Sequence, residues 1–318
     1  MRIATVVCFL NEANGLGRVL TALEAQSRPP DRLLLVDDGS TDASPELADA
    51  FAARVAYART VRRPARPPAA DRLAEAAELR AFQAALAQLD GEYDVIAKLD
   101  ADIVLTPEVI AAVENAFAAD PELGITGPYL SVTTPTGTSV RERCPQYHVR
   151  GAVKFYRGKC LDQIAPLPPI LGWDTIDEVG ARLNGWRTGS FAAPGGDPVH
   201  LRPTGAHDGH LRAFYRWGAC AYAIGDHPAW LVLGALRRGT DRPWGAGGLA
   251  YLAGWAAARS RRAPRAQPEV RAHARREQVG RLRRLGPEVL RRPPRSHSER
   301  MRLNPDDATR RDRSQRHG

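Results

Sequence analysis

The chain has 318 residues, which is enough for one large or two ordinary domains with a substantial core. Lys and Arg outnumber Asp and Glu by 45 to 36, but residues 259–318 hold 19 Arg and 7 acidic residues, so residues 1–258 hold 26 basic and 29 acidic residues. This distribution excludes a uniformly basic protein and places the positive charge in the C-terminal part, where it can meet anionic lipid, nucleic acid or an acidic partner. The four Cys lack Cys-x-x-Cys spacing, which argues against a zinc site and favours a reduced, cytoplasmic protein.

The first 125 residues alternate between short apolar runs and helix-like segments. The N-terminal run is too short for a signal peptide or a membrane span, and it predicts a first strand. We expect strands over 4–10, 33–36, 55–61 and 94–99, helices after residue 11, from Ser44 and over 72–89, a loop over 62–71, and a further helix capped by Thr106. Ser44 reads as an N-cap, with Pro45 at the first helical position. This order predicts an α/β fold of parallel βαβ units with helices on both faces of the sheet.

The alternation fades beyond about residue 130. We expect a turn in "TTPTGTSV", a helix over 150–163, a Gly-bounded helix in "GWDTIDEVGARLNGW" and a short strand in "PVHLRP". Two apolar stretches follow, over 219–236 and 245–258, and neither is a convincing membrane span. The sequence therefore predicts a domain over 1–218, apolar helices over 219–258, and an Arg-rich tail over 259–318 whose final part is disordered.

Polar side chains follow three of the predicted strands: Asn11-Glu12, Asp37-Asp38, and Asp100 with Asp102. In a parallel sheet, ligands gather at the carboxyl ends of the strands, so these three positions are expected to converge. Residues i and i+2 of a strand share a face, which points Asp100 and Asp102 the same way and turns Ala101 inward. Such a pair suits a divalent cation that bridges to a diphosphate, although Asp side chains can also cap local backbone groups at a solvated strand end.

The stretches "VVCFLNEA", "LLLVDDGSTDAS" and "VIAKLDADIVL" resemble, in this order, the family-2 inverting glycosyltransferases with the GT-A fold, of the exopolysaccharide and cell-surface glycan type. The resemblance implies a Rossmann-like, mostly parallel mixed sheet, with a nucleotide-sugar half over 1–125 and an acceptor half over 126–218. It implies that Asp38 contacts the base, that Asp100 lies near the ribose, and that Asp102 binds Mn²⁺ or Mg²⁺. Phe9, Asn11, Glu12 and Ala101 would line the nucleotide-sugar pocket.

The resemblance also assigns the second half of the site. An acidic residue at the start of a helix serves as general base in the family, which falls on Asp174 or, less directly, Asp177. Trp173 would stack on a sugar, His200 would complete the metal site, and Arg150 and Arg157 would contact donor phosphates or acceptor. Each has a structural alternative: Thr175 and Glu178 fit a capping box that explains the acidic residues, and Trp173, His200 and the arginines suit a core or a solvated helix face.

The implied activity is a metal-dependent inverting transfer, of the hexosyltransferase type, from a nucleoside-diphosphate sugar to a glycan or lipid-linked acceptor in cell-surface polysaccharide synthesis. The protein would be cytoplasmic, or peripheral on the inner face of the plasma membrane through its apolar stretches and arginines. A sugar nucleotidyltransferase is the enzymatic alternative, but "NEANGLGRVL" has too few glycines for its phosphate loop, and a dinucleotide site lacks its third glycine. A nucleic-acid or anionic-surface binder using the tail would leave the acidic strand ends unexplained.

Overall fold

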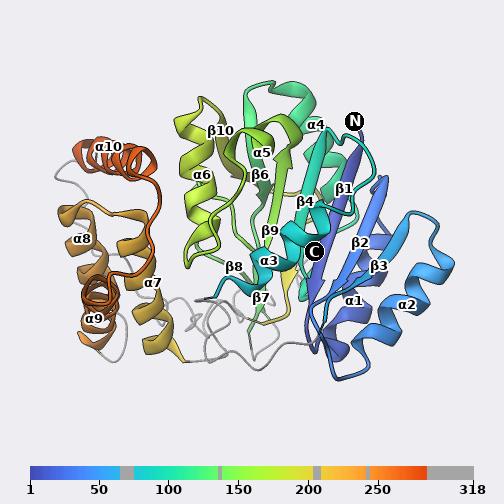
Figure 1. Cartoon of the computed structure of the whole chain (residues 1–318), viewed down its shortest axis with the longest axis horizontal. Helices are drawn as coiled ribbons and strands as arrows, with labels where there is room; N and C mark the ends of the chain where they lie inside the picture. The colour runs from blue at the N-terminus through green and yellow to red at the C-terminus, as the bar shows by residue number, and fades with distance from the viewer. Residues whose placement is uncertain (65–74, 135–137, 203–208, 241–243, 285–318) are drawn as a thin grey trace, which may run out of the picture. The chain divides into compact units, whose positions relative to one another are not determined.

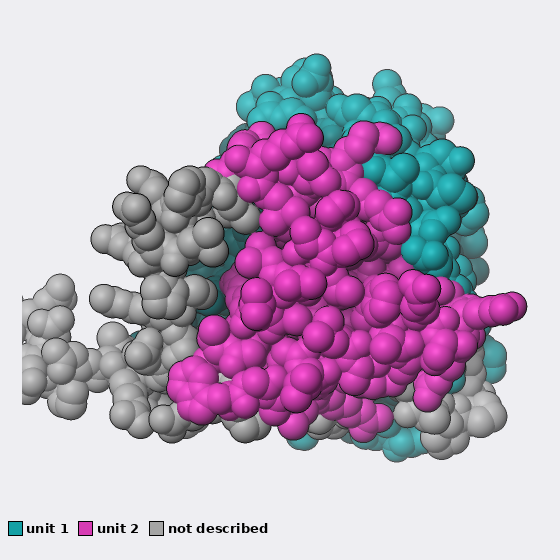
Figure 2. All heavy atoms as spheres, turned by 90° about the vertical axis from the view of Figure 1, so that its left-hand side faces the viewer, with its two compact units in different colours: residues 1–207, 264–273 teal, residues 208–263, 274–318 magenta. Residues whose placement is uncertain are grey.

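The structure is a computed structural model that describes residues 1–64, 75–134, 138–202, 209–240 and 244–284 (Figure 1). The chain forms two compact units, coloured separately in Figure 2. Unit 1 comprises Met1–His207 and Pro264–His273, and unit 2 comprises Asp208–Ala263 and Ala274–Gly318. The predicted boundary at 218/219 lies inside helix α7 (His210–Ile224).

Unit 1 is built on a seven-stranded sheet with the order β10-β6-β9-β4-β1-β2-β3. Its strands are β1 (Ile3–Phe9), β2 (Arg32–Asp37), β3 (Ala58–Arg62), β4 (Val95–Asp100), β6 (Leu123–Pro128), β9 (Val153–Arg157) and β10 (Arg187–Phe191). Strand β9 is antiparallel to β4 and β6, whereas the other neighbours pair in parallel. This confirms the predicted α/β fold with a mixed, mostly parallel sheet. A second sheet has the order β5 (Ile103–Val104), β11 (Val199–His200), β7 (Ser131–Thr133), β8 (Ser139–Arg141).

Helices cover both faces of the large sheet (Figure 1). Alternate strand residues point to opposite faces, so Val7, Leu35 and Leu99 enter one buried cluster while Val6 and Leu34 enter another. The first cluster is completed by α1 (Ala13–Glu24), α2 (Ser44–Arg54) and α4 (Val109–Ala119), and the second by α3 (Ala77–Leu86), α5 (Gly158–Ile164) and α6 (Trp173–Leu183). Both faces are apolar because a central parallel sheet is buried on both sides.

The predicted helix over 150–163 is wrong. Residues 153–157 form β9, between β4 and β6, and only α5 is helical. The segment "VKFYR" combines Val with two aromatic residues, which favour strands, and the sheet needs a strand at this place. The spacing of its residues suggested a helix because it carries no information about pairing with β4 and β6.

The two predicted caps are also wrong, and the capping box that the sequence offered as an alternative does not form. Helix α2 begins at Ser44 with Pro45 in its first turn, but the Ser44 hydroxyl accepts a hydrogen bond from the Glu12 amide instead of capping the helix. Thr106 donates its hydroxyl to the Gly196 carbonyl, and α4 begins only at Val109. Helix α6 is preceded by Gly172 in the left-handed region, so the expected capping box at Thr175 does not form. In each case a contact from elsewhere in the chain takes the polar group that local pairing would have used.

Unit 2 contains α7, α8 (Pro228–Gly239), α9 (Ala246–Ser260) and the residues of α10 (Pro268–Arg284) from Ala274 onward. Helices α7 and α9 pack backbone to backbone: a Cβ on Gly218 would lie 1.8 Å from the Tyr251 carbonyl oxygen, and one on Gly254 would lie 1.8 Å from that of Tyr215. None of the helices in the described part of the chain has the length and hydropathy that crossing a bilayer requires. The predicted loop over 65–71 and the predicted disorder from residue 285 fall outside the described residues.

Candidate active site

The loops after β1 and β2 hold each other in place at the carboxyl edge of the sheet. Asn11 adopts the left-handed region at φ 54, and its Oδ1 accepts a 2.8 Å hydrogen bond from the Thr41 amide. In return, the Asn11 amide donates to the Ser40 hydroxyl at 3.0 Å. The Asp37 carboxylate closes the turn by accepting from the Ser40 amide at 2.8 Å, and Gly39 supplies the required φ of 92. The Asp37 carboxylate therefore stabilises the turn.

The neighbouring carboxylates meet on the sheet face covered by α3 and α6. Cys8 pairs with Asp100 across the β1–β4 ladder, and the Asp38 amide donates to the Phe9 carbonyl at 3.0 Å. Burial raises the pKa of the Cys8 thiol, and the charges of Glu78, Asp100 and Asp38 raise it further, which requires those carboxylates to lie close to it. Asp38 and Asp100 therefore follow neighbouring positions of β1, next to Phe9 and Cys8.

Two cations balance this group. Arg63 forms an ion pair with Asp38. Lys98, which is 1% exposed, forms ion pairs with Asp100 and Glu78 and donates to the Gly151 carbonyl at 2.7 Å. Burial disfavours its charge, yet the two carboxylates raise the pKa of Lys98, so it stays an ammonium.

Asp102 and His200 are brought together by the second sheet. Strand β11 pairs with β5 in a register that sets His200 opposite Ile103, and His200 Nε2 lies 3.5 Å from Asp102 Oδ2. The Arg202 guanidinium donates to the same carboxylate at 2.9 Å and forms an ion pair with Glu12, which follows β1. Residues 98 positions apart in sequence therefore form one cluster at the end of the sheet, with Glu12 joined to it.

The charges of this cluster shift the pKa values of both Asp102 and His200. Burial opposes ionisation of Asp102, but the hydrogen bond from His200 and the charges of His200 and Arg202 lower the pKa of the carboxyl below its usual value. Burial likewise disfavours the imidazolium, but Asp102 and Glu142 raise the pKa of His200 to about 9. A cation is thus favoured beside Asp102, and Arg202 now supplies it.

The donor set fits a divalent metal that is completed by phosphate and water. His200 Nδ1 lies 3.2 Å from Glu142 Oε1, which leaves Nε2 facing Asp102, and an imidazole fixed in this way by a carboxylate is the usual arrangement of a metal-ligating His. Mn²⁺ and Mg²⁺ commonly take only one or two protein ligands beside substrate phosphates. Within the described residues, no group of three or more His, Cys, Asp and Glu side chains is placed to hold a metal ion. Arg150 approaches the same cluster, 3.3 Å from Glu142.

Asp174 lies in the first turn of α6, not ahead of the helix as predicted. Its side chain is half-buried, and a Cβ on Gly151 would lie 2.5 Å from Asp174 Oδ2. Because Lys98 donates to the Gly151 carbonyl, Asp174 is close to the Asp100 end of the site. Trp173 is buried in the core, with Lys98 Nζ 5.6 Å from its ring centroid.

Asp177 belongs to a buried ion-pair network below the site. Its carboxylate accepts from Lys154 Nζ at 2.8 and 2.9 Å and from the Tyr156 hydroxyl at 2.6 Å. Lys154 also lies 3.0 Å from Glu178, and all three charged side chains are at most 1% exposed. The structure therefore gives Asp177 three protein donors and no exposed oxygen.

Arg157 is the predicted residue that the structure removes from the site. It pairs with Val95 at the start of β4, the opposite end from Asp100. Its guanidinium donates to the carbonyls of Leu123, Phe117 and Asp120 at 2.8–2.9 Å. Phe9 and Ala101 lie at the correct edge, but their side chains are buried in the core cluster.

Several charged residues of the site were not predicted. Lys98 and Lys154 are opposite each other in the β4–β9 ladder. A Lys inside an apolar strand of an Arg-rich chain is unusual, and this pattern in the sequence could have indicated both residues. Arg202 follows His200 by two residues. No local sequence pattern indicates Glu142 or Glu78 as site residues. The fold brings these five residues to their places.

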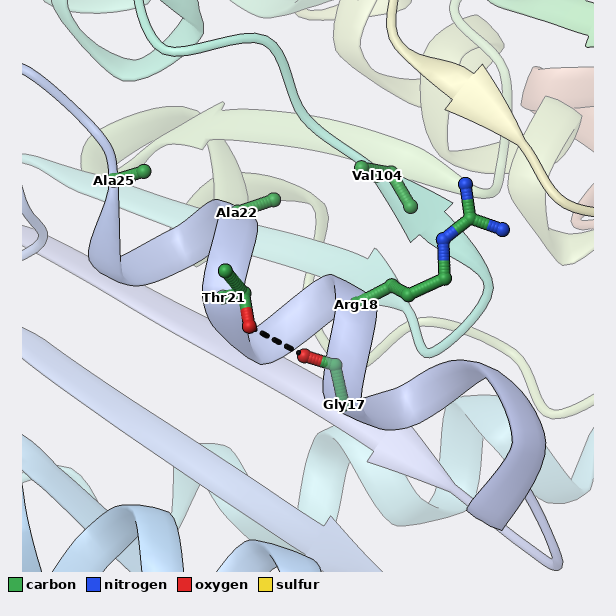
Figure 3. Close-up of a pocket in the computed structure, with 6 residues that line it drawn as sticks. All are labelled: Gly17, Arg18, Thr21, Ala22, Ala25 and Val104. Carbon is green, nitrogen blue, oxygen red and sulfur yellow. Dashed lines mark hydrogen bonds between the residues drawn. The ribbon is translucent and has the colours of Figure 1, made fainter.

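Two surface hollows lie away from this cluster. A cavity of about 360 Å³ lies between α1 and β5 and is lined by Gly17, Arg18, Thr21, Ala22, Ala25 and Val104 (Figure 3). A second, of about 510 Å³, lies along β10 between Asp120 and Phe191. Neither contains a predicted site residue.

Comparisons with known proteins agree with this geometry. The chain resembles a mannosyltransferase from Pyrobaculum calidifontis solved with GDP-Man and Mn²⁺ (TM-score 0.56, 18% identity, 90% of this chain and 81% of that one). It also resembles GalNAc-T7 solved with UDP, GalNAc and Mn²⁺ (0.53, 11%, 75% and 51%) and residues 1–349 of S. aureus TarS solved with UDP-GlcNAc (0.50, 15%, 74% and 67%). At these identities the likeness shows the fold, and no curated protein matches the sequence.

The sequence itself carries the family signal. Residues 5–164, about half of the chain, match the family described as glycosyl transferase family 2. That span begins in β1, includes all of Asp38, Asp100 and Asp102, and ends with α5. Together with the GT-A sheet, the match establishes that this chain belongs to glycosyl transferase family 2 and is a glycosyltransferase.

Proposed function

We propose that the protein is a metal-dependent inverting glycosyltransferase of the hexosyltransferase type. It moves a sugar from a nucleoside-diphosphate sugar to a glycan or lipid-linked acceptor in cell-surface polysaccharide synthesis. The acceptor is proposed to be used on the cytoplasmic side, with the enzyme peripheral on the inner face of the plasma membrane.

The observation that carries the proposal is the pairing of Asp102 with His200 beside the carboxylates of Asp38 and Asp100. Three acidic residues at the ends of two strands, β2 and β4, lie at the carboxyl edge of the sheet, and among the described residues Arg63, Lys98 and Arg202 form ion pairs with them. Asp37, not Asp38, closes the turn, and we propose that a nucleotide base takes the place of Arg63 beside Asp38. Asp102 and His200 would hold Mn²⁺ or Mg²⁺, which supplies charge stabilisation for the departing diphosphate when bound.

We propose Asp174 rather than Asp177 as the general base. Asp174 retains partial exposure at the start of α6, whereas Asp177 is committed to Lys154 and Tyr156. The base accepts the acceptor hydroxyl proton as the oxygen forms its bond to the sugar C1 and the bond to the diphosphate breaks, which inverts C1. Arg150 and the other predicted nucleotide-sugar contacts (Phe9, Asn11, Glu12, Ala101, Trp173) remain part of this proposal, and Arg157 is left out of it.

The test is a thermal-shift panel of nucleoside diphosphates and their sugars, each with and without Mn²⁺. We expect one nucleotide to stabilise the protein only when metal is present; a ligand at 100 times its Kd contributes about 2.7 kcal/mol. Asp102→Asn should abolish the metal-dependent part and the transfer activity, whereas Asp162→Asn, an exposed carboxylate on α5, should change neither. Full metal-dependent transfer by Asp102→Asn would refute the assignment.

A further inference from the structure

Two helices of unit 2 carry an apolar surface that faces solvent. Its members are the exposed side chains Val232, Leu236, Leu249, Leu252, Ala253 and Ala256, which we call the α8–α9 face. Leu249 is 70% exposed, Leu236 65% and Val232 55%. Leucines at such exposure on neighbouring helices are uncommon in a surface that only water covers.

The spacing places apolar residues on the exposed side of each helix as well as on its buried side. Leu249, Leu252, Ala253 and Ala256 recur at i, i+3, i+4 and i+7, which places them along one stripe of α9. The buried side of α9 instead carries Gly247, Gly248 and Gly254, which allow close approach. Between residues 246 and 258 α9 has no charged residue, so its solvent-facing stripe lacks the polar groups that a surface helix normally presents.

The two stripes adjoin each other. A Cβ on Gly248 would lie 2.5 Å from the Ala235 carbonyl oxygen, so α8 and α9 are in backbone contact at these residues. Leu236 and Leu249, the next residue in each helix, are both exposed. The connection between the helices adds Trp244, 67% exposed, where Gly245 donates to the Gly239 carbonyl at 2.9 Å.

Exposed arginines flank the apolar stripes. Arg237 ends α8, beside the connection with Trp244, and Arg259 and Arg261 end α9 at the far side. An apolar stripe with a Trp and arginines at its ends matches the profile of a bilayer interface with anionic headgroups. A second copy of this chain would instead set arginines near arginines, which charge repulsion disfavours.

We propose that the α8–α9 face is a docking surface for an anionic phospholipid bilayer. The two helices lie in the interface, with the leucines and Trp244 below the headgroups and the arginines on the phosphates; no described helix of the chain spans the bilayer. This inference rests on the peripheral membrane placement in the proposed function and names the surface that makes the contact. Vesicle binding is measured without donor or acceptor, so it can fail while sugar transfer remains intact. Unit 2, which carries this face, is drawn in magenta in Figure 2.

The experiment is co-sedimentation of the full chain with vesicles of phosphatidylcholine alone and with 30% phosphatidylglycerol, at low and high salt. We expect the wild type to bind the anionic vesicles and Leu236→Glu/Leu249→Glu to bind at least tenfold more weakly. The matched control is Leu47→Glu, an exposed leucine on α2 that is 37% exposed and lies in unit 1. Its binding should equal the wild type, and circular dichroism checks that each variant is folded.

A second readout places the helices in the bilayer. Vesicles should shift the tryptophan emission of the wild type to shorter wavelength, and Trp244→Phe should remove most of that shift. Three outcomes would overturn the proposal: no binding to anionic vesicles, binding that the leucine variant leaves intact and high salt abolishes, as the Arg-rich tail alone would produce, or a dimer in solution that Leu236→Glu/Leu249→Glu dissociates.

Discussion

Substitution of Lys154 tests how the buried carboxylates of α6 are stabilised. Its ammonium lies 2.8 Å from Asp177 and 3.0 Å from Glu178, and it also donates to the Asp174 carbonyl. Burial disfavours the charge of Lys154, but the two carboxylates raise its pKa, so the group is charged at neutral pH. Lys154→Met keeps the length of the side chain, removes the cation from the buried Asp177 carboxylate and leaves Glu178 with His148 and Arg182.

The expected loss follows from that geometry. Removing one member of a buried ion pair costs about 3–5 kcal/mol, because the charge left behind stays desolvated. A domain typically has about 5–15 kcal/mol of net stability, so the substitution should remove a large share of it. Lys154→Met/Asp177→Asn/Glu178→Gln should recover part of the loss, since no buried charge then remains.

Urea unfolding at pH 7, followed by circular dichroism, measures the effect. Lys159→Met is the matched control, because Lys159 is the exposed lysine five residues further along the same segment. We expect the control to lie within about 0.5 kcal/mol of the wild type. A Lys154→Met variant as stable as that control would show that the buried carboxylates do not need the ammonium, and the reasoning would fail.

Three further predictions concern the scaffold. Burial opposes the charge of Glu178, but Lys154 and His148 lower its pKa from 4.5 to about 2. The contribution of this carboxylate to folding stability is therefore present above pH 4.5 and is lost as the pH falls toward 2. In acid-unfolding curves, Glu178→Gln should cost about 3 kcal/mol at pH 7 and less at pH 3. Arg157→Gln should lower the free energy of unfolding by about 1–3 kcal/mol without changing the KM for the donor, whereas a raised KM would return Arg157 to the site. Gly254→Ala should lower the thermal midpoint of unit 2 in calorimetry, because the added methyl meets the Tyr215 carbonyl, and an unchanged midpoint would contradict that contact.

The sequence alone determined the order of strands and helices through residue 125 and the edge of the sheet where the carboxylates gather. Apolar runs of strand length followed by Asn11-Glu12, Asp37-Asp38 and Asp100 required little tertiary information, since parallel strands place their carboxyl ends together. Local pattern also found α6 as a Gly-bounded helix, although the alternative capping box would place its N-cap at Thr175 instead of Gly172.

Tertiary structure decided what each polar group does. The β9 strand, the pairing of Asp102 with His200, and the distinction between Asp174 and the buried Asp177 all depend on partners far away in sequence. The same holds for Arg157, which the family resemblance placed at the ligand and which strand β9 places at the other end of the sheet. Hydrophobic periodicity reports which face of an element is buried, but the neighbour that neutralises a buried charge is chosen only when the chain has folded.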